Sequence, residues 1–294
     1  MKSGFTAIVG KPNVGKSTLL NRLIGTKVSI VSDKRQTTRN RINAIANLPD
    51  AQVIFIDTPG IHKPHHGLGK RMVQAARTAM EEVDLILFVT DATSPARDDD
   101  RTVASYIRDL GTPAWLVINK KDLVDEETLA VSERACRALG EFDRVKILSA
   151  ETGENLEGFI GEIADAMPEG PMYYPPDMVV DRPEEFFIAE LIREKLLELT
   201  REEVPHSIAV VVEEMIPRED RDIVDVSATV YVDRESQKGI VIGAGGSVLK
   251  EAGARARLEA ERLLGSQINL KTWVKVRRGW RDDEAILDRL GYSE

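Results

Sequence analysis

Short apolar runs alternate with helical patterns over the first 167 residues of the chain. The runs are rich in β-branched residues, as strands buried on both faces are, and they lie at residues 5–9, 53–56, 85–89, 114–118 and 145–148. Helical periodicity fills much of the sequence between them, at residues 70–82, 98–110, 126–139 and 156–166. This alternation predicts an α/β domain in which a mostly parallel sheet carries helices on both faces. Residues 41–48 alternate between apolar and polar or small side chains and predict an edge strand, for which an antiparallel direction is one option.

A proline-rich stretch divides the chain in two. The sequence MPEGPMYYPPD, residues 167–177, holds four prolines, which exclude a helix or a central strand and predict an interdomain linker. We therefore expect one domain at residues 1–170, a linker at 171–183 and a second domain at 184–294. In the second domain the pattern predicts a helix, two strands, two helices and a strand, at residues 184–200, 208–216, 223–232, 236–242, 247–264 and 268–276.

The composition narrows the class of protein. The 294 residues are 42% apolar, enough for about two domains with ordinary cores, and no apolar run is long enough to span a membrane. The first residues lack the pattern of a signal peptide, and the one cysteine, Cys136, cannot form an internal disulfide, so both features favour the cytoplasm. A net charge of −9 argues against a protein that coats nucleic acid with its whole surface, but it leaves room for a local basic patch.

The sequence GKPNVGKS, residues 10–17, fits the phosphate-loop pattern G-x-x-x-x-G-K-[ST] and stands between a predicted strand and a predicted helix. Its glycines allow backbone N–H groups to close around phosphate oxygens at the positive N-terminus of the helix. We expect Lys16 to reach the β- and γ-phosphates and the Ser17 hydroxyl to bind Mg²⁺. The nucleotide-binding residues expected here are Gly10, Asn13, Val14, Gly15, Lys16, Ser17 and Thr18.

Two further motifs follow later strands and point to a guanine nucleotide. In DTPG, residues 57–60, we expect Asp57 to hold Mg²⁺ through water and the Gly60 N–H to bond the γ-phosphate. In NKKD, residues 119–122, the carboxylate of Asp122 only accepts hydrogen bonds. Guanine offers it two adjacent donors, N1–H and the exocyclic amine, whereas adenine lacks them, so the motif selects guanine.

The neighbours of Asp122 complete the expected base site. We expect Asn119 to brace the loops and reach the base, and the stem of Lys120 to lie over the ring. A last motif after the strand at residues 145–148 adds Ser149, Ala150 and Glu151, of which the Ala150 N–H is expected to bond guanine O6.

These motifs in this order resemble the GTPase domain of the translation-factor-like superfamily. The resemblance implies a first switch between residues 25 and 40, in which Thr38 matches the threonine that closes on Mg²⁺ and the γ-phosphate. The expected catalytic residues are then Lys16, Thr38 and Gly60, and the expected metal ligands are Ser17, Thr38 and Asp57.

The same resemblance exposes one departure from the signalling GTPases. Ile61 stands where they carry the glutamine that orients the attacking water, so we expect slow unaided hydrolysis. Asn13 matches the asparagine that helps to bind a potassium ion in related GTPases, which adds K⁺ to the expected cofactors GTP or GDP and Mg²⁺.

Two other polar stretches are interpreted without a ligand. His62, His65 and His66 lie in residues 61–70, which the resemblance implies form the second switch. This loop is rich in Gly, Pro and Lys, which favours a solvated switch loop over a metal site. Residues 97–101 hold three aspartates between two arginines and favour a solvated helix start, whose acids suit the helix dipole.

The second domain carries features typical of RNA binding. The sequence GAGG at residues 243–246 joins two predicted helices, as the G-x-x-G loop of KH domains does, and the predicted order of elements matches a type II KH domain. Residues 236–281 hold ten Lys or Arg against three Glu, a local balance of +7 that would attract phosphates. We expect Trp273 to belong to the core. The expected RNA-binding residues are Gly243, Ala244, Gly245, Gly246, Lys250, Arg255 and Arg257.

With both halves in view, the chain resembles the Era family of bacterial GTPases, including the linker GPMYYPPD and the segment DRPEEFFIAELIREKLL. The resemblance implies a GTP-driven switch that binds the 3′ region of 16S ribosomal RNA and assists maturation of the 30S ribosomal subunit. It also implies peripheral association with the cytoplasmic membrane, and we expect a monomer. Two alternatives stay open: a signalling GTPase whose second domain docks a protein partner, and a tRNA-modifying or other RNA-processing GTPase.

Overall fold

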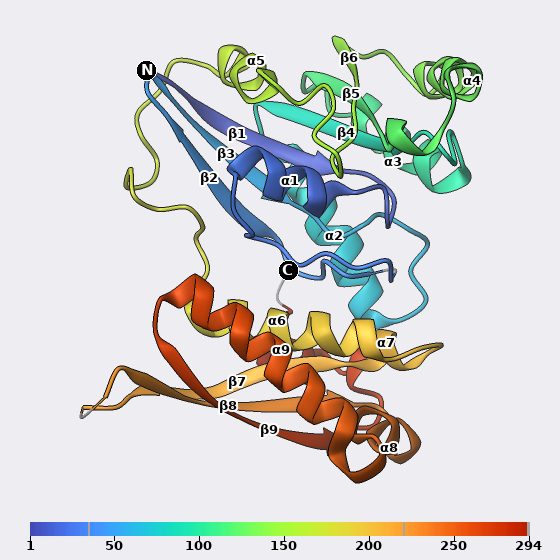
Figure 1. The fold of residues 1–294 in the computed structure, drawn as a ribbon. Helices are drawn as coiled ribbons and strands as arrows, with labels where there is room; N and C mark the ends of the chain where they lie inside the picture. The colour runs from blue at the N-terminus through green and yellow to red at the C-terminus, as the bar shows by residue number, and fades with distance from the viewer. Residues whose placement is uncertain (35, 220, 293–294) are drawn as a thin grey trace.

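The computed structural model describes residues 1–34, 36–219 and 221–292. Two bodies are stacked in Figure 1, with the N-terminal half above the C-terminal half. The upper body is built on a six-stranded sheet in the order β2-β3-β1-β4-β5-β6. Its strands are β1 (Lys2–Val9), β2 (Ile42–Leu48), β3 (Ala51–Asp57), β4 (Leu85–Asp91), β5 (Ala114–Asn119) and β6 (Arg144–Ile147).

All neighbouring strands of this sheet run parallel except β2, which lies at the edge and pairs antiparallel with β3. The expected mostly parallel sheet is thereby confirmed, and residues 41–48 form an antiparallel edge strand. Helices cover both faces; they are α1 (Lys16–Ile24), α2 (Gly67–Glu81), α3 (Asp98–Arg108), α4 (Glu126–Arg137) and α5 (Phe159–Ala166).

The buried side chains explain why the sequences of the strands are continuous apolar runs. Ile8 and Leu87 pack on one face with α1 and α5, whereas Ala7 and Phe88 pack on the other with α2, α3 and α4. Successive residues of a strand point to opposite faces, so a strand covered on both faces needs apolar residues throughout. The carboxyl ends of β1 and β3 meet at one edge of the sheet, where the phosphate-loop and DTPG motifs begin.

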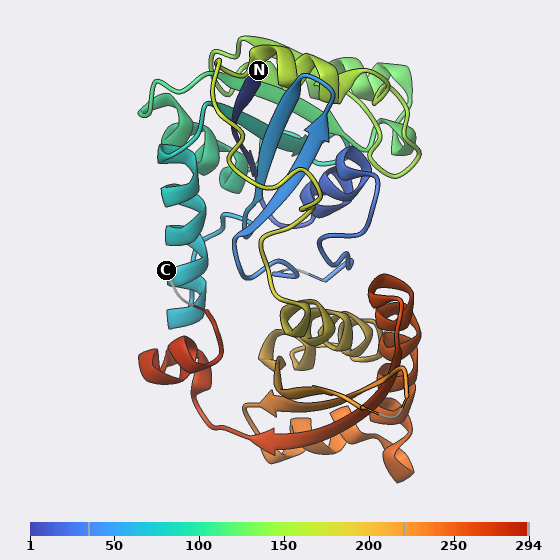
Figure 2. The ribbon, with the colours of Figure 1, turned by 90° about the vertical axis from the view of Figure 1, so that its left-hand side faces the viewer.

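The proline-rich segment leaves the upper body in an extended path along its outer strands (Figure 2). It is anchored there, because the backbone N–H groups of Tyr173 and Tyr174 donate to the buried Gln52 Oε1 at 2.8 and 3.0 Å. Val180 then forms a bridge with Ala44 of β2. This segment therefore fixes the point from which the lower body starts.

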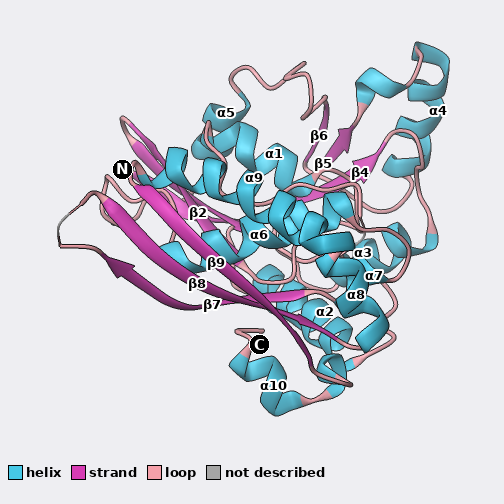
Figure 3. Ribbon diagram, turned by 60° about the horizontal axis from the view of Figure 1, so that its bottom comes forward, coloured by secondary structure: helices cyan, strands magenta, loops and turns pink. Residues whose placement is uncertain are grey.

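The lower body holds a three-stranded sheet in the order β7-β8-β9, with β8 antiparallel to β7 and parallel to β9. Two long helices, α6 and α9, cover one face, and in Figure 3 the strands lie in front of them. The elements are α6 (Glu184–Leu199), α7 (Val204–Ser207), β7 (Ala209–Pro217), β8 (Ile223–Val232), α8 (Glu235–Ile242), α9 (Ser247–Leu264), β9 (Gln267–Val276) and α10 (Glu284–Arg289).

None of the helices in the described ranges is both long enough and apolar enough to cross a bilayer.

Candidate nucleotide and RNA sites

The phosphate loop surrounds a buried ammonium. Lys16 is the first residue of α1, and its Nζ donates to the carbonyl oxygens of Gly10 and Lys11 at 3.2 and 3.0 Å. Burial lowers the pKa of Lys16 to about 8, opposed by attraction to Asp57. A cation held in this way by the loop is the charge that a bound β- or γ-phosphate would neutralise. Thr18 lines the same pocket, whereas the Val14 side chain is buried in the core.

The three expected metal ligands lie together. Ser17 Oγ is 2.9 Å from Asp57 Oδ2 and 2.8 Å from Thr38 Oγ1, and Thr38 Oγ1 is 3.4 Å from Asp57 Oδ2. Asp57 is fully buried, which raises its pKa, and within the described residues its Oδ1 has no hydrogen-bond partner. Oxygen ligands with an unpaired buried carboxylate oxygen among them fit Mg²⁺, a hard cation that prefers oxygen.

The DTPG motif packs directly against the phosphate loop. A Cβ at Gly60 would lie 2.7 Å from the Pro12 backbone nitrogen, so only glycine allows this close approach. The next residue, Ile61, is completely buried in the core, and its N–H donates to the Gly10 carbonyl at 3.1 Å. The Ile61 side chain therefore offers no polar atom to the pocket that Lys16 and Thr38 line.

Asn119 ties together the loops of the base site. Its Nδ2 donates to the Val14 carbonyl at 2.8 Å, and its Oδ1 accepts from the Ala150 N–H at 2.8 Å. The Ala150 N–H thus bonds Asn119, and a bond from this N–H to guanine O6 stays a prediction. Lys120 Nζ forms an ion pair with Asp91 at 2.7 Å.

The remaining base-site residues differ in exposure. Asp122 and Glu151 are exposed, whereas Ser149 is buried and its Oγ accepts from the Thr152 N–H at 3.1 Å. Asn13 is also exposed, and its Nδ2 donates to the Asp33 carbonyl at 2.7 Å, which joins the phosphate loop to the first switch.

The acid-rich start of α3 is only partly in solvent, so its interpretation as a solvated helix start is wrong for Asp100. This side chain is fully buried and accepts from Lys11 Nζ at 2.8 Å and from the Arg97 N–H at 2.9 Å. The phosphate loop supplies the partner, which the local sequence around residue 100 does not reveal.

The chain's four histidines, His62, His65, His66 and His206, line one cleft between the two bodies. His62 Nε2 lies 2.8 Å from Gln36 Nε2 of the first switch, and His66 Nδ1 accepts from the Gly69 N–H at 2.9 Å at the start of α2. In the part of the chain that the structure describes, no group of three His, Cys, Asp or Glu side chains is placed to hold a metal ion.

The G-x-x-G loop between α8 and α9 is open. Gly245 and Gly246 have φ angles of 60° and 82°, and a Cβ at either position would meet nothing within 4 Å. Gly243 differs, because a Cβ there would lie 2.6 Å from the Val248 side chain. Ala244 is exposed, and so is Lys250 in the first turn of α9. A nucleic-acid backbone could therefore approach the loop and find a cation beside it.

Arg255 and Arg257 are placed differently from Lys250. They lie on α9 about 12 and 15 Å along the helix from its first residue. Each is paired with an acid one turn further along or back: Arg255 Nε with Glu251 Oε1 at 2.7 Å, and Arg257 Nη1 with Glu261 Oε1 at 2.8 Å. The structure thus brings Lys250, but not these two arginines, to the G-x-x-G loop.

The expectation that Trp273 belongs to the core is wrong. Its side chain is 49% exposed on β9, whereas Trp280 is completely buried and donates from Nε1 to the Ser207 carbonyl at 3.0 Å. In a short strand the sequence does not show which of the two alternating sets of side chains faces the helices. Packing in the folded protein decides this.

The first switch segment also contacts the second body, which the sequence did not predict. Arg39 is buried, donates from Nη1 to the Ile208 carbonyl at 2.6 Å, and has its guanidinium over the rings of Trp280 and Tyr292, at 5.8 and 6.0 Å. Arg193 of α6 donates to the Thr37 carbonyl.

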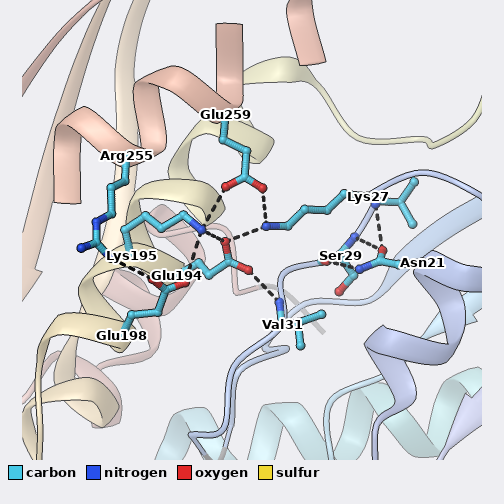
Figure 4. A network of polar contacts seen from close by, with 10 residues as sticks. Asn21, Lys27, Ser29, Val31, Glu194, Lys195, Glu198, Arg255 and Glu259 are labelled. Atoms are coloured by element: carbon cyan, nitrogen blue, oxygen red, sulfur yellow. Dashed lines mark hydrogen bonds and ion pairs between the residues drawn. The ribbon is translucent and has the colours of Figure 1, made fainter. Parts of the chain in front are cut away.

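A charged network forms the other half of this contact (Figure 4). Lys27 Nζ, in the loop after α1, is 2.7 Å from Glu194 Oε2 of α6 and 2.6 Å from Glu259 Oε1 of α9. Glu194 Oε1 also accepts from the Val31 N–H at 2.9 Å, and Lys195 pairs with both acids. The Glu194 carboxylate of the second body thus binds the first switch at two residues, Lys27 and Val31.

The C-terminal segment packs against the start of α2, as Figure 2 shows for α10. Arg71 Nη1 contacts Asp288 Oδ1 at 2.5 Å and the Tyr292 carbonyl at 2.8 Å, and the Gly67 N–H donates to Asp282 Oδ1 at 2.7 Å. Both switch segments therefore contact the second body.

The comparisons with known proteins agree with this geometry. Residues 5–120 match the family described as 50S ribosome-binding GTPase, and residues 203–281 match the KH domain family. The GTPase Era of Carboxydothermus hydrogenoformans is 50% identical to this chain over 296 residues, which cover 100% of this chain and 98% of that protein.

Two solved structures are similar over their whole length. One is an Aquifex aeolicus Era variant bound to GDP·AlF₄⁻, and the other is an Era in complex with MgGDPNP and nucleotides 1506–1542 of 16S ribosomal RNA. Each is 43% identical, with a TM-score of 0.96 and coverage of 100% of both chains. The predicted fold, a phosphate-loop GTPase domain followed by an α+β KH domain, is thereby confirmed.

Proposed function

This chain belongs to the Era family of GTPases, and from that premise we propose that it is a GTP-driven switch that binds the 3′ region of 16S ribosomal RNA and assists maturation of the 30S subunit. The single observation that carries the proposal is that both switch segments contact the KH domain, the first through Arg39 and the second through Gly67. Such contacts give the nucleotide a physical route to the RNA-binding half of the molecule. We assign the GTP-binding domain to residues 1–170, the linker to 171–183 and the KH domain to 184–294.

In this proposal the phosphate loop and the switches carry the reaction. Lys16 neutralises charge on the β- and γ-phosphates, and the Gly60 N–H bonds the γ-phosphate. Ser17, Thr38 and Asp57 would hold Mg²⁺, which when bound offsets the charge of the phosphate oxygens. Thr38 belongs to the first switch, and its hydroxyl already lies beside Ser17 and Asp57, where it could join them in holding the metal.

Base recognition rests on Asp122, whose exposed carboxylate accepts from the two donors of guanine. Asn119 fixes the loops on either side through its bonds to Val14 and Ala150. Lys120 is held by Asp91, which sets the direction of its stem beside the base.

Potassium is part of the proposal because Ile61 cannot orient water. Asn13 is exposed at the mouth of the phosphate pocket, beside the first switch. A potassium ion held there would add positive charge near the transferring phosphate, which is the task of an arginine finger in other GTPases.

The RNA half of the proposal is tested by changing Gly245 and Gly246 together to Asp. These positions have open space around them, so the new carboxylates project into the path of the RNA and repel its phosphates, while the GTP site is untouched. We expect loss of binding to RNA of nucleotides 1506–1542 of 16S ribosomal RNA, with unchanged GTP affinity. A control, Gly253→Asp, places one carboxylate on α9 outside the loop, at a position that also has open space around it.

RNA affinity that survives this double change in a folded protein would contradict the proposal and favour the protein-docking alternative. The proposed location is the cytoplasm, supported by Cys136, which is a free and buried thiol, and peripheral contact with the cell membrane and a monomeric state are proposed with it.

A further inference from the structure

The face of the KH-domain sheet that points away from α6 and α9 carries an exposed aromatic ring. Along β9 and the residue that follows it, every second position from Lys271 to Arg277 is exposed, and Trp273 is one of them, with an exposure of 49%. Trp115 and Trp280 are 4% and 0% exposed. A large ring left in solvent on an otherwise polar face marks a contact surface rather than a core position.

The ring is flanked by cations on the same face. We call Lys271, Trp273, Lys275 and Arg277 the β9 strip. Among the residues that the structure describes, no acid forms an ion pair with these three cations, in contrast to Arg255 and Arg257 of α9. The β9 strip therefore carries three of the region's cations that form no ion pair with a described residue, in addition to Lys250 beside the G-x-x-G loop.

The strands beside β9 do not cancel this charge. Thr229 of β8 lies opposite Trp273, and Ser227 and Tyr231 lie opposite Lys271 and Lys275. Further along β8, Asp225 is bound by Nε and Nη2 of Arg218 at 2.7 Å and by Asn269 at 2.6 Å, and it also attracts Lys271.

The other acids on this side, Glu213 and Glu214, belong to β7, which is two strands and about 9–10 Å away from β9. The β9 strip therefore presents an aromatic ring between positive charges at the edge of the sheet.

We propose that the β9 strip is a second RNA contact of the KH domain, which binds single-stranded RNA that extends beyond the G-x-x-G loop. The inference rests on the proposed RNA-binding function and adds a stacking site to it. One base stacks on Trp273 while Lys271, Lys275 and Arg277 hold the neighbouring phosphates, the combination by which proteins bind single strands.

The position of β9 makes a continuous path possible. β9 is an edge strand, so no further strand separates its open face from solvent on that side. Its carboxyl end lies beside α8, the helix that leads into the G-x-x-G loop (Figure 1). RNA that leaves the loop can therefore pass the edge of the sheet and reach the strip.

The test uses the full chain, RNA of nucleotides 1506–1542 of 16S ribosomal RNA, and oligonucleotides shortened progressively from either end. We expect Trp273→Ala to raise the Kd for the long RNA about tenfold and to leave the Kd for the shortest bound oligonucleotide unchanged. Trp273→Phe keeps a ring and should retain most of the affinity. Leu258→Ala is the matched control, because Leu258 is also 49% exposed but lies on α9.

The cations are tested by salt dependence. Lys271→Gln together with Lys275→Gln should lower the slope of log Kd against log salt by about 1–2 for the long RNA. Arg101→Gln together with Arg134→Gln, exposed residues of α3 and α4, removes the same charge from the GTPase domain and should leave the slope unchanged.

Fluorescence gives an independent measurement, because Trp273 is the exposed ring of the chain's three tryptophans. Long RNA should quench this emission and protect it from acrylamide, and Trp273→Phe should abolish the change. The second contact would be overturned if Trp273→Ala bound every RNA with wild-type affinity and the G-x-x-G variant still failed to bind. A wild-type chain that binds none of these RNAs would instead overturn the proposed function itself.

Discussion

At the scale of single residues, the proposed choice of base rests on the exposed carboxylate of Asp122. Asp122→Asn should weaken GDP binding by at least about tenfold and improve binding of xanthosine diphosphate, because the amide offers a donor where xanthine presents a carbonyl and guanine presents an amine. Competition between the two nucleotides for the purified chain measures the change. Asp125→Asn is the control, since it alters an aspartate three residues away that caps α4 and that asparagine can replace. Unchanged guanine preference in Asp122→Asn would contradict the assignment of NKKD.

Asn13 permits a second prediction at this scale. We expect GTP hydrolysis to be several-fold faster in KCl than in NaCl at equal ionic strength, because a potassium ion at Asn13 would supply charge that Ile61 cannot replace. Asn13→Ala should remove the difference between the salts while leaving GTP affinity within a few-fold of the wild type. Equal rates of the wild-type chain in both salts would argue for an external activator instead.

Single residues also mark the limit of what the sequence could predict. The sequence predicts roles for Lys16, Ser17 and Asp57 because such roles require a fixed spacing within short motifs that follow strands, and the structure brings the three side chains together. Asp100 and Trp273 were misjudged, because burial depends on a partner far along the chain or on the side of a sheet that faces helices. Local composition contains neither piece of information.

At the scale of elements, α2 begins with an unusual cap. The neutral ring of His66 accepts a hydrogen bond from the Gly69 N–H, and desolvation lowers the pKa of His66 to about 4, with repulsion by Arg281 and Arg39 adding to it. A protonated ring could not accept this bond and would lie at the positive end of the helix.

The pH dependence of stability follows from this cap. In the unfolded chain His66 gains a proton below about pH 6.5, whereas in the folded chain it stays neutral down to about pH 4. The stabilisation is thus complete above pH 6.5 and is lost as the pH falls from 6.5 to 4. Full linkage would give about 3 kcal/mol, and because the ring is half-buried we expect about 1–2 kcal/mol.

His66→Asn tests this, because asparagine caps a helix without titrating. Between about pH 7 and about pH 5 in urea unfolding, the wild type should lose about 0.5–1 kcal/mol more than the variant, since this interval covers about half of the titration. His65→Asn, an exposed neighbour outside the cap, is the control. If His66→Asn and the wild type lost the same free energy of unfolding between the two pH values, the His66 cap would not be the group that titrates.

The elements themselves were largely predictable. Each strand and helix expected from the pattern occurs within about three residues of its predicted bounds, because buried strands and amphipathic helices need different apolar periods. The antiparallel direction of β2 could not be predicted. The alternating pattern of an edge strand indicates which face is buried, but it does not indicate the direction of the strand.

At the scale of the whole molecule, the contact between the two domains was not predictable. The sequence places Arg39 in a segment that is expected to be a flexible switch. In the structure its side chain is buried against Trp280 and Tyr292 and bonded to the Ile208 carbonyl. Its partners in the second body lie 166 or more residues away in the sequence. Such pairing is a property of how two folded bodies meet, for which a single sequence carries no periodic signal.

This contact has a thermodynamic consequence. If the first switch moves when the γ-phosphate is lost, the bonds that it makes to the KH domain change with it, so GTP and RNA must influence each other's affinity by the same factor. The charged network around Glu194 is the part of the contact that can be altered with least disturbance to packing, since it consists of long side chains at the domain boundary.

Glu194→Gln should uncouple the two ligands. The amide keeps the size of the side chain but loses the ion pair with Lys27 and weakens the bond from the Val31 N–H, so the KH domain no longer holds the first switch. The matched control is Glu198→Gln, one turn along α6, whose partners Lys195 and Arg255 both belong to the KH domain. The measurement is the Kd for RNA of nucleotides 1506–1542 with a non-hydrolysable GTP analogue and with GDP. We expect the ratio of the two Kd values to fall severalfold toward 1 in Glu194→Gln and to keep its wild-type value in Glu198→Gln. An equal fall in both variants would mean that charge alone, and not the bond across the domain boundary, links nucleotide to RNA.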